Sequence, residues 1–471
     1  MKKGDIIEHL RVETMAAEGK SIAHYNGAVV FLKGAAPGDV ASAALTKIKP
    51  QFLEAVVTQI EQLSPHRTAP VCSHFGLCGG CSWQHIIYSE QIKYKEQQVT
   101  DHLTRIGGLT LPSVNPILAS PDSLHYRNKL DFTFTANRWM SAEELSDAKR
   151  ENRFETGLGF HIPRMYDRVF DVAECHLQPE PSNGIRLLAK EIACRENIPF
   201  FDLRKQVGFL RTLTIRTTVA GEAMVILQVT YDERKWIEKI LSGITAAFPQ
   251  ITSCHYIING KKNDTFADLD IICWKGKPYI TEQMKKPRGD GQLQFRIGPK
   301  SFYQTNPRQA YELYKTVWRM AALTGKENVF DLYTGTGTIA HFIASDARHV
   351  LGIEYVEDAV RDARINSQLN NISNAEFIVG DMKDILHEAF VSSHSPDVVI
   401  ADPPRNGMHE DVCRALLTLS PQKIVYVSCN PATQARDLKI LSAAYRITEV
   451  QPIDMFPHTT HVENAVKLEK H

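Results

Sequence analysis

From about residue 291 onward, the sequence alternates short apolar runs with longer helix-like segments. Five runs have the length and composition of buried strands: 328–331, 350–353, 375–379, 398–401 and 424–428. Strands that alternate with helices pair in parallel, because each helix carries the chain back across the sheet. The sequence therefore predicts a doubly wound α/β domain with a Rossmann-like fold over residues 291–471. Its ligands should lie outside the carboxyl ends of the strands.

The remaining sequence predicts two further domains, which agrees with roughly three domains for 471 residues. Residues 1–62 contain apolar runs at 5–12, 28–32, 39–47 and 51–60, separated by turn sequences such as Asn26-Gly27 and Pro37-Gly38. Five short strands of this kind would form an OB-like β-barrel, which serves either as a structural cap or as an RNA-docking module. Residues 63–290 are expected to form a central α+β domain, with strands near 129–135, 212–218 and 224–230 and a polar surface insertion over 137–153.

Charge and hydropathy restrict the class of protein. The sequence has 54 Lys and Arg against 54 Asp and Glu, so it is not a histone-like polycation, although a local basic groove is possible. No apolar run approaches the roughly 18 residues of a membrane helix, and the first residues lack the apolar core of a secretory signal. Nine cysteines without such a signal indicate reduced thiols, metal ligands or a nucleophile, and a cytoplasmic location is expected.

A nucleotide site is predicted at the strand ends of the C-terminal domain. Gly335 and Gly337 follow the first strand and open a helix, so the backbone can turn tightly against a ligand. Glu354 ends the second strand, where it can accept hydrogen bonds from ribose hydroxyls, and Asp381 follows the third strand, near an adenine edge. The dinucleotide pattern G-x-G-x-x-G is incomplete, which favours S-adenosylmethionine over NAD. Asp402 precedes two prolines, whose rigid loop would cover the methyl donor.

Cys429 and Glu463 are the candidate catalytic residues. Cys429 follows the fifth strand and precedes Asn430-Pro431, so it should lie at the sheet edge, beside the proposed cofactor. An accessible thiol there can act as a nucleophile, although a free cysteine is more often a small core residue. Glu463 could serve as a general base, with His458 or His461 orienting its neighbours.

A second group of cysteines suggests a metal site. Cys72, Cys78 and Cys81 lie close together in a Gly- and His-rich loop, and Cys175 follows in the central domain. Four thiolates can bind zinc or an iron–sulfur cluster. Four cysteines have no partner pattern and are expected in the core: Cys194, Cys254, Cys273 and Cys413.

Taken together, these motifs resemble the RNA uracil-5-methyltransferases, which make 5-methyluridine from S-adenosylmethionine. The motifs that carry the resemblance are Ser301–Asn306, Asp331–Gly337, Asp402-Pro403-Pro404-Arg405, Ser428–Pro431 and His461-Val462-Glu463. The N-terminal module is similar to the TRAM domain of several family members. The resemblance implies that Cys429 is the nucleophile and Glu463 the base. It implies cofactor contacts at Gln304, Tyr333, Gly335, Glu354, Asp381 and Asp402, and substrate contacts at Phe302 and Arg127.

The resemblance also implies a 4Fe-4S cluster on the four cysteines, with zinc as the alternative, and it implies that a segment of about 88–120 packs on the catalytic domain. The expected partner is RNA, with 23S ribosomal RNA preferred over transfer RNA, and the enzyme is expected to be a monomer. Two other hypotheses stay open at this point. One is an amino-group methyltransferase that uses the Asp-Pro-Pro loop, and the other is a non-catalytic RNA-binding assembly factor.

Overall fold

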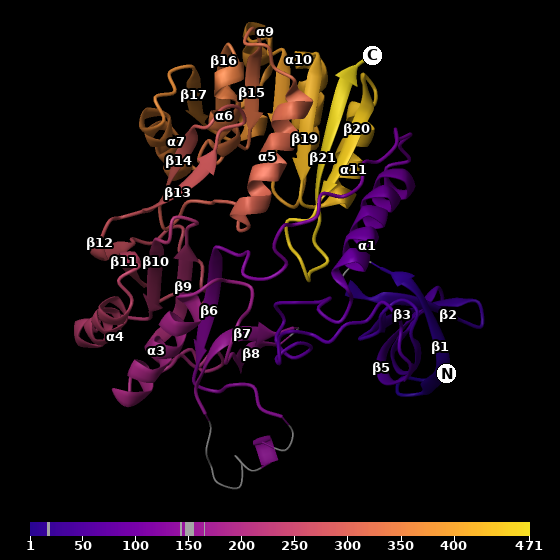
Figure 1. Ribbon diagram of the computed structural model, residues 1–471, viewed down its shortest axis with the longest axis vertical. Helices are drawn as coiled ribbons and strands as arrows, with labels where there is room; N and C mark the ends of the chain where they lie inside the picture. Colours follow the sequence, from indigo (N-terminus) through magenta and orange to yellow (C-terminus); the bar gives the residue numbers. More distant parts are fainter. Residues whose placement is uncertain (17–18, 142–143, 147–154, 164) are drawn as a thin grey trace.

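The computed structural model describes residues 1–16, 19–141, 144–146, 155–163 and 165–471. Figure 1 shows three parts: an N-terminal barrel, a central domain and a C-terminal sheet covered by helices on both faces. Much of the polar insertion predicted over 137–153 lies outside the described residues. Among the described residues, no helix is both long and apolar enough to cross a membrane.

The N-terminal module is the predicted five-stranded β-barrel. Its strands are β1 (Ile6–Met15), β2 (Ser21–Tyr25), β3 (Ala28–Lys33), β4 (Val40–Ile48) and β5 (Phe52–Gln62), closed in the order β1-β2-β3-β5-β4. Four of them match the predicted runs, and β2 is the fifth strand that the runs left unnamed. Asn26 and Gly27 join β2 to β3 with φ of 48° and 80°. Two left-handed residues in a two-residue loop match the twist of a tight hairpin.

The central domain is built on a seven-stranded sheet with the order β12-β11-β10-β9-β6-β7-β8. Its strands are β6 (Lys129–Thr135), β7 (Gly157–Ile162), β8 (Met165–Asp171), β9 (Leu210–Thr217), β10 (Ala223–Val229), β11 (Ile251–Ile258) and β12 (Ile272–Gly276). Helices α3 (Ser182–Arg195) and α4 (Arg234–Ala247) share a hydrophobic core with these strands. A hairpin of β13 (Ile280–Lys285) and β14 (Gln292–Ile297) then leads into the C-terminal domain.

The C-terminal domain has the predicted doubly wound sheet, in the order β17-β16-β15-β18-β19-β21-β20. The five predicted strands are β15 (Asn328–Leu332), β16 (His349–Glu354), β17 (Ala375–Val379), β18 (Val398–Ala401) and β19 (Lys423–Ser428), which pair in parallel. The sequence analysis did not identify β20 (Tyr445–Ile453) and β21 (Glu463–Lys470). Strand β21 lies between β19 and β20 and is antiparallel to both.

Helices cover both faces of this sheet. One core is formed with α5 (Pro307–Ala321), α6 (Thr338–Ile343) and α7 (Glu357–Leu369). The core on the other face includes residues of α8 (Met382–Ile385), α9 (Glu388–Ser393), α10 (Glu410–Leu419) and α11 (Pro431–Leu441). This layering leaves the carboxyl ends of the parallel strands directed toward the central domain (Figure 1).

A segment that precedes the central domain in sequence packs against the C-terminal sheet. Helix α1 (Tyr88–Asp101) continues into the π-helical turn His102–Ile106, and its Val99 and Leu103 belong to the same core as Val450 of β20. Beyond this turn, Val114 and Leu118 form parallel bridges to Val450 and Ile453. Figure 1 shows α1 beside β20 and α11, between the barrel and the C-terminal sheet.

The four cysteines without a partner pattern divide into two groups. Cys254 and Cys413 are buried, as expected for core residues. The prediction was wrong for Cys194 and Cys273, which are exposed. Cys194 belongs to the last turn of α3, and Cys273 lies on β12, which is an edge strand of the central sheet. A cysteine at an element's end or edge can remain in solvent although its residue type favours burial.

Candidate active site

The sheet topology brings Cys429 and Glu463 to one edge. Parallel strands β18 and β19 end there, and antiparallel β21 begins there. Ser428 pairs with Asn464 at the last rung of the β19–β21 ladder, so the next residue on each strand, Cys429 and Glu463, lies just beyond that rung. Adjacent strands lie about 5 Å apart. Two residues separated by 34 positions in sequence therefore become neighbours through strand pairing.

A buried amide pair braces this strand end from behind. The Gln434 side chain on α11 donates to the backbone oxygens of Tyr426 on β19 (3.0 Å) and Asn464 on β21 (3.1 Å). Asn464 in turn donates to Gln434 Oε1 at 2.8 Å, and both side chains are fully buried. Because buried polar groups are costly unless they are bonded, this arrangement fixes the relative position of the two strands.

Cys429 is half-buried among charged groups. Burial is the main cause that raises the pKa of its thiol, to about 11, and the nearby carboxylates of Glu463 and Asp402 raise it further. The Arg405 guanidinium acts in the opposite direction, because its positive charge favours the thiolate. The surroundings therefore hold the thiol protonated in the free protein, with one cation placed to stabilise the thiolate.

The charge of Asp402 acts on the carboxyl group of Glu463. Glu463 is only 4% exposed, and burial, followed by repulsion from Asp402, raises its pKa to about 8. Burial and the charge of Asp331 raise the pKa of Asp402 to about 7. Both carboxyl groups can therefore exchange a proton near neutral pH, which suits a general acid or base.

Arg405 joins three elements of the site, and the sequence analysis did not place it among the site residues. Its backbone oxygen accepts hydrogen bonds from the side chains of Asn430 (3.1 Å) and Thr433 (3.1 Å), at the start of α11. Its guanidinium lies 3.4 Å from Nε2 of His461. Burial and the positive charge of Arg405 lower the pKa of His461 to about 4, so its neutral ring can accept this bond. The available signal was its place at the end of the Asp-Pro-Pro-Arg motif.

The glycine turn after β15 has the predicted tight geometry. Gly335 and Gly337 have φ of 56° and 77°, and Tyr333 has φ of 63°, a left-handed conformation that a non-glycine residue adopts at a cost. The Glu354 carboxylate accepts hydrogen bonds from the backbone N–H groups of Gly335 (3.1 Å) and Val356 (3.0 Å). The turn thus presents its backbone and an acidic side chain at one point of the sheet edge.

Two other predicted cofactor residues are Asp381, which follows β17, and Gln304, which lies in the loop before α5. Asp381 is exposed and caps α8 by accepting from the Lys383 N–H. Gln304 is buried, and its backbone oxygen accepts from the side chain of Asn128, which ties the loop before α5 to the central domain. Tyr355 follows Glu354 and is 69% exposed, so it offers an open aromatic face that the sequence analysis missed. An aromatic residue directly after the acidic strand end was the available signal.

The two predicted substrate residues have different environments. The Phe302 side chain is 64% exposed, so its ring is free to stack on another ring. Arg127 is only half-exposed. Its guanidinium lies 6.0 Å from the centre of the Phe456 ring, and its side chain lines the same cavity as the four candidate metal ligands.

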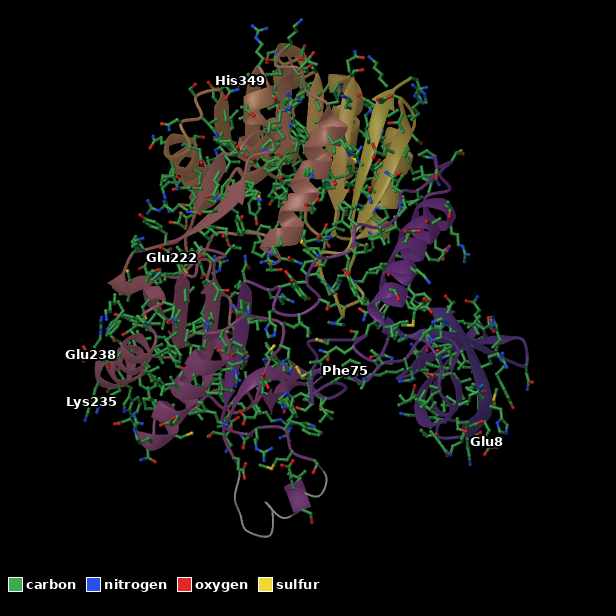
Figure 2. The ribbon with its side chains drawn as sticks, in the orientation of Figure 1. Glu8, Phe75, Glu222, Lys235, Glu238 and His349 are labelled. Carbon is green, nitrogen blue, oxygen red and sulfur yellow. The ribbon has the colours of Figure 1, made fainter. Side chains whose placement is uncertain are left out.

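That cavity has a volume of about 350 Å³ and lies in the central domain. It is next to the loop that carries Cys72, Cys78 and Cys81, which we call the cysteine-bearing loop. It is lined by all four predicted ligands, which are Cys72, Cys78, Cys81 and Cys175. Figure 2 labels Phe75 of this loop at the junction between the barrel and the central domain. Among the described residues, no group of three or more His, Cys, Asp or Glu is arranged to hold a single metal ion.

Comparison with known proteins agrees with this architecture. A family model described as tRNA (Uracil-5-)-methyltransferase matches residues 269–471, and the TRAM domain model matches residues 7–58. A Bacteroides thetaiotaomicron protein named "Uncharacterized RNA methyltransferase" is 50% identical over 459 residues, which cover 97% of this chain and 100% of that protein. A Porphyromonas gingivalis protein of the same name is 50% identical over 466 residues, covering 98% and 99%.

A solved structure extends the similarity to three dimensions. The tRNA (uracil-54, C5)-methyltransferase of Pyrococcus abyssi, in complex with S-adenosyl-L-homocysteine, has a TM-score of 0.72 and 28% identity and covers 98% of this chain and 100% of its own. The chain therefore belongs to the RNA uracil-5-methyltransferase family and carries an N-terminal TRAM domain. Its reaction is the S-adenosylmethionine-dependent methylation of carbon 5 of uracil in RNA.

Proposed function

We propose that the enzyme methylates a uridine of 23S ribosomal RNA, with Cys429 as nucleophile and Glu463 as general base. The observation that carries the catalytic assignment is the pairing of β19 with β21, which sets the thiol and the buried carboxyl group side by side. A nitrogen methyltransferase would have no use for that thiol. The neighbouring Arg405, which favours the thiolate, gives this cysteine a chemical role beyond filling space.

Carbon 5 of uracil is too weak a nucleophile to attack a methyl sulfonium group unaided. The Cys429 thiol first loses its proton to solvent, and Arg405 favours the resulting thiolate. The thiolate then forms a bond to carbon 6, and the electrons of the carbon 5–carbon 6 double bond move into the ring as an enolate. Carbon 5 then takes the methyl group, for which S-adenosylmethionine supplies the electrophilic carbon, and S-adenosylhomocysteine is the product. This order of events needs the sulfur within bonding reach of the ring before the transfer.

Glu463 completes the reaction in this proposal. Its carboxylate accepts the hydrogen from carbon 5 as a proton, the double bond re-forms, and the bond from carbon 6 to Cys429 breaks, so that the thiolate leaves. The raised pKa of Glu463, about 8, makes the carboxylate a stronger base than an ordinary glutamate. Arg405 stabilises the thiolate at the start and at the end of the cycle, because it faces the sulfur directly.

The cofactor contacts are proposed at the strand ends around the glycine turn. We assign the ribose hydroxyls to the Glu354 carboxylate, which accepts two backbone N–H bonds beside the glycine turn. Gly335 permits close approach of the backbone. The proposal assigns the remaining contacts to Gln304, Tyr333, Asp381 and Asp402, with Tyr355 added as an aromatic neighbour of Glu354.

Phe302 and Arg127 are proposed as RNA contacts. An exposed phenyl ring at the site can offset part of the cost of flipping the target base, which is a few kcal/mol. Arg127 would act from the rim of the cysteine cavity, where a phosphate or base edge could reach its guanidinium.

A 4Fe-4S cluster is proposed on Cys72, Cys78, Cys81 and Cys175. The four thiols fit this group because all of them line one cavity. Neighbouring cysteines raise the pKa values of Cys78 and Cys81, so four thiolates gathered there would need a cationic partner. Zinc, which four cysteine thiolates also bind, is the alternative. When bound, the cluster would supply a structural link rather than electrons, since methyl transfer consumes none.

Transfer RNA is the second candidate substrate. The structural similarity to the Pyrococcus abyssi tRNA (uracil-54, C5)-methyltransferase favours it, and 23S ribosomal RNA is favoured by the combination of a TRAM domain with the four-cysteine pattern. Either substrate agrees with a monomeric enzyme that acts in the cytoplasm, which is part of the proposal.

Two experiments test the proposal. Purified enzyme is incubated with 5-fluorouridine-substituted RNA and S-adenosylmethionine. Carbon 5 then carries fluorine in place of the hydrogen that the base removes, so the covalent complex is trapped. We expect a protein–RNA adduct that resists denaturing gels and depends on Cys429, and a nitrogen methyltransferase or a non-catalytic factor would give none. Mapping 5-methyluridine in RNA of a deletion strain identifies the substrate, and loss of a transfer RNA site alone would exclude 23S ribosomal RNA.

A further inference from the structure

The loop between β20 and β21 delivers Glu463 to the active site. It begins with Asp454, directly after Ile453 of β20, and ends with Val462, directly before Glu463. It also carries His461, whose ring faces the Arg405 guanidinium. We call residues 454–462 the base loop. From the catalytic domain, Asn306 donates to the backbone oxygen of Met455 and Arg405 contacts His461. The other partners of the base loop precede that domain in sequence and are residues 82–83, helix α1, Leu118 and Tyr126.

The start of the base loop is held by a buried ion pair. Lys95 of α1 places its Nζ 2.5 Å from Oδ1 of Asp454 and also donates to the backbone oxygen of Phe456 at 2.9 Å. The Tyr88 hydroxyl donates to the other oxygen of Asp454 at 2.8 Å. The side chains of Lys95 and Asp454 are fully buried. A buried ion pair contributes little net stability compared with an apolar pair, but it tolerates few alternative geometries.

The middle of the base loop is held by Gln91, one turn before Lys95 on the same helix. The Gln91 Oε1 accepts the N–H of His458 at 3.0 Å, and its Nε2 lies 3.1 Å from Nδ1 of the same residue. His458 has φ of 62°, a backbone conformation that a non-glycine residue keeps only when its surroundings impose it. Burial lowers the pKa of His458 to about 4, so the neutral ring can accept the amide hydrogen.

The same residue is bonded from the cysteine-bearing loop. The backbone N–H groups of Ser82 and Trp83, which follow Cys81 directly, donate to the oxygen of His458 at 2.8 and 3.0 Å. The Tyr126 hydroxyl donates to the oxygen of Pro457 at 3.1 Å. Gln91 also donates to the backbone oxygen of Trp83, so α1 and the cysteine-bearing loop act on the base loop together.

We propose that Lys95 and Gln91 are positioning residues for the general base: they fix the base loop, and through it they set Glu463 and His461 against Cys429. The proposal rests on the proposed roles of Cys429 and Glu463. It deepens them by assigning part of the catalytic geometry to a helix that lies outside the catalytic sheet in sequence.

The two halves of the reaction should respond differently to a loosened base loop. Cys429 directly follows β19, which is not part of the base loop, so addition to the ring should persist. The Gln434–Asn464 brace holds β21 from the residue after Glu463, whereas the base loop holds Glu463 from the residue before it. Removal of the hydrogen from carbon 5 requires an accurately placed Glu463 and should slow. Covalent enzyme–RNA intermediate should therefore accumulate, whereas a purely structural role would lower the amount of folded enzyme without that accumulation.

The test uses full-length Gln91→Leu and the double variant Lys95→Met with Asp454→Leu, which removes the buried pair without leaving one charge unpaired. Gln97→Leu is the matched control, because Gln97 lies on the exposed face of the same helix and bonds only Asp101 among the contacts described. Each protein receives labelled S-adenosylmethionine and total RNA from a strain lacking the enzyme. Turnover, S-adenosylhomocysteine affinity and the fraction of protein in a gel-stable adduct are measured.

For Gln91→Leu we expect kcat to fall by at least about tenfold, a larger adduct fraction than in wild type, and unchanged S-adenosylhomocysteine affinity. The double variant should show the same pattern, and Gln97→Leu should match wild type. Normal turnover in both α1 variants, or lost turnover without adduct accumulation in folded protein, would overturn the inference. If wild type forms no adduct with 5-fluorouridine RNA, the roles proposed for Cys429 and Glu463 fail, and this inference fails with them.

Discussion

The protein contains two sets of thiols, which are Cys429 and the four cysteines of the cavity. The two sets are alike in the effect of burial on their pKa values and differ in the charges around them. Burial raises the pKa of Cys429 to about 11, and burial likewise raises the pKa values of Cys78 and Cys81 to about 11 and 12. Around Cys429, the further charges are two carboxylates and one arginine. Around Cys78 and Cys81, the further charges are mainly those of other cysteines.

This difference indicates what each set can do. A single thiol beside a guanidinium and a basic carboxylate can form and release one bond, because local groups handle its charge and a proton. The thiols around Cys78 and Cys81 oppose the ionisation of these two residues, although Arg186 and Arg127 favour ionisation of Cys175. Such a set of thiols suits a bound cationic centre. Burial raises the thiol pKa in both sets, so it does not distinguish a nucleophile from a metal ligand. The charges next to the thiols do distinguish them.

The largest effect on methylation is expected when Cys429 is replaced. Cys429→Ala should lower methylation by about 10⁶-fold, the scale seen when a catalytic nucleophile is removed, because no other thiol occupies the strand end. S-adenosylhomocysteine affinity should stay unchanged, as measured by calorimetry, since the glycine turn is separate from the thiol. Substantial turnover in this variant would show that the thiol is only a packing residue.

Glu463→Gln tests the carboxylate that accompanies Cys429. We expect turnover to fall by about 10²- to 10⁴-fold, the usual contribution of a general base, because the amide cannot accept the hydrogen from carbon 5. Natural RNA should then remain bound to Cys429 as an adduct visible on denaturing gels. Wild-type turnover without accumulated adduct would assign the base to another residue.

The pH dependence of adduct resolution tests the role of Glu463 directly. The pKa of Glu463 is raised to about 8, so below that pH its carboxyl group carries the proton and cannot act as a base. The rate of adduct resolution should rise by about tenfold per pH unit from pH 6 toward 8 and then level off. Single-turnover measurements would show this, and Glu463→Gln should abolish the dependence. A flat wild-type profile would contradict the assignment.

The smallest effect on turnover is expected at the second thiol set. Cys81→Ser should lose most of the iron from anaerobically prepared protein and lower the thermal midpoint, with turnover reduced by about 10- to 100-fold, because the loop that bonds His458 is loosened. Exposed Cys194→Ser is the control. Iron and sulfide assays with trapping by 5-fluorouridine RNA provide the readouts. Equal iron in both variants, or zinc in wild type, would remove the cluster.

The sequence was sufficient for the parts of the fold that repeat locally. The five parallel strands of the C-terminal sheet could be located because each is a short apolar run between helical segments. The barrel was predicted from alternating runs and turns such as Asn26-Gly27. Strands β20 and β21 were missed because their polar positions interrupt the apolar pattern, and their pairing joins segments that no local signal connects.

The site divides in the same way. The thiol, the glycine turn and the acidic strand ends were found as motifs, although their catalytic and binding roles stay predictions. The sequence could not show that Arg405 faces both Cys429 and His461, since that geometry depends on the path of the loop after β18. It also could not show that Lys95 and Asp454 pair, because 359 positions separate them in the chain.

Strand β21 has a consequence for the order in which the molecule is completed. It comes last among the sheet strands in sequence, yet it lies between two strands that precede it. With the proposed roles, a chain in which β19 had formed before β21 was inserted would carry the nucleophile without the base. Insertion of β21 between β19 and β20 would then be the step that completes the proposed catalytic pair.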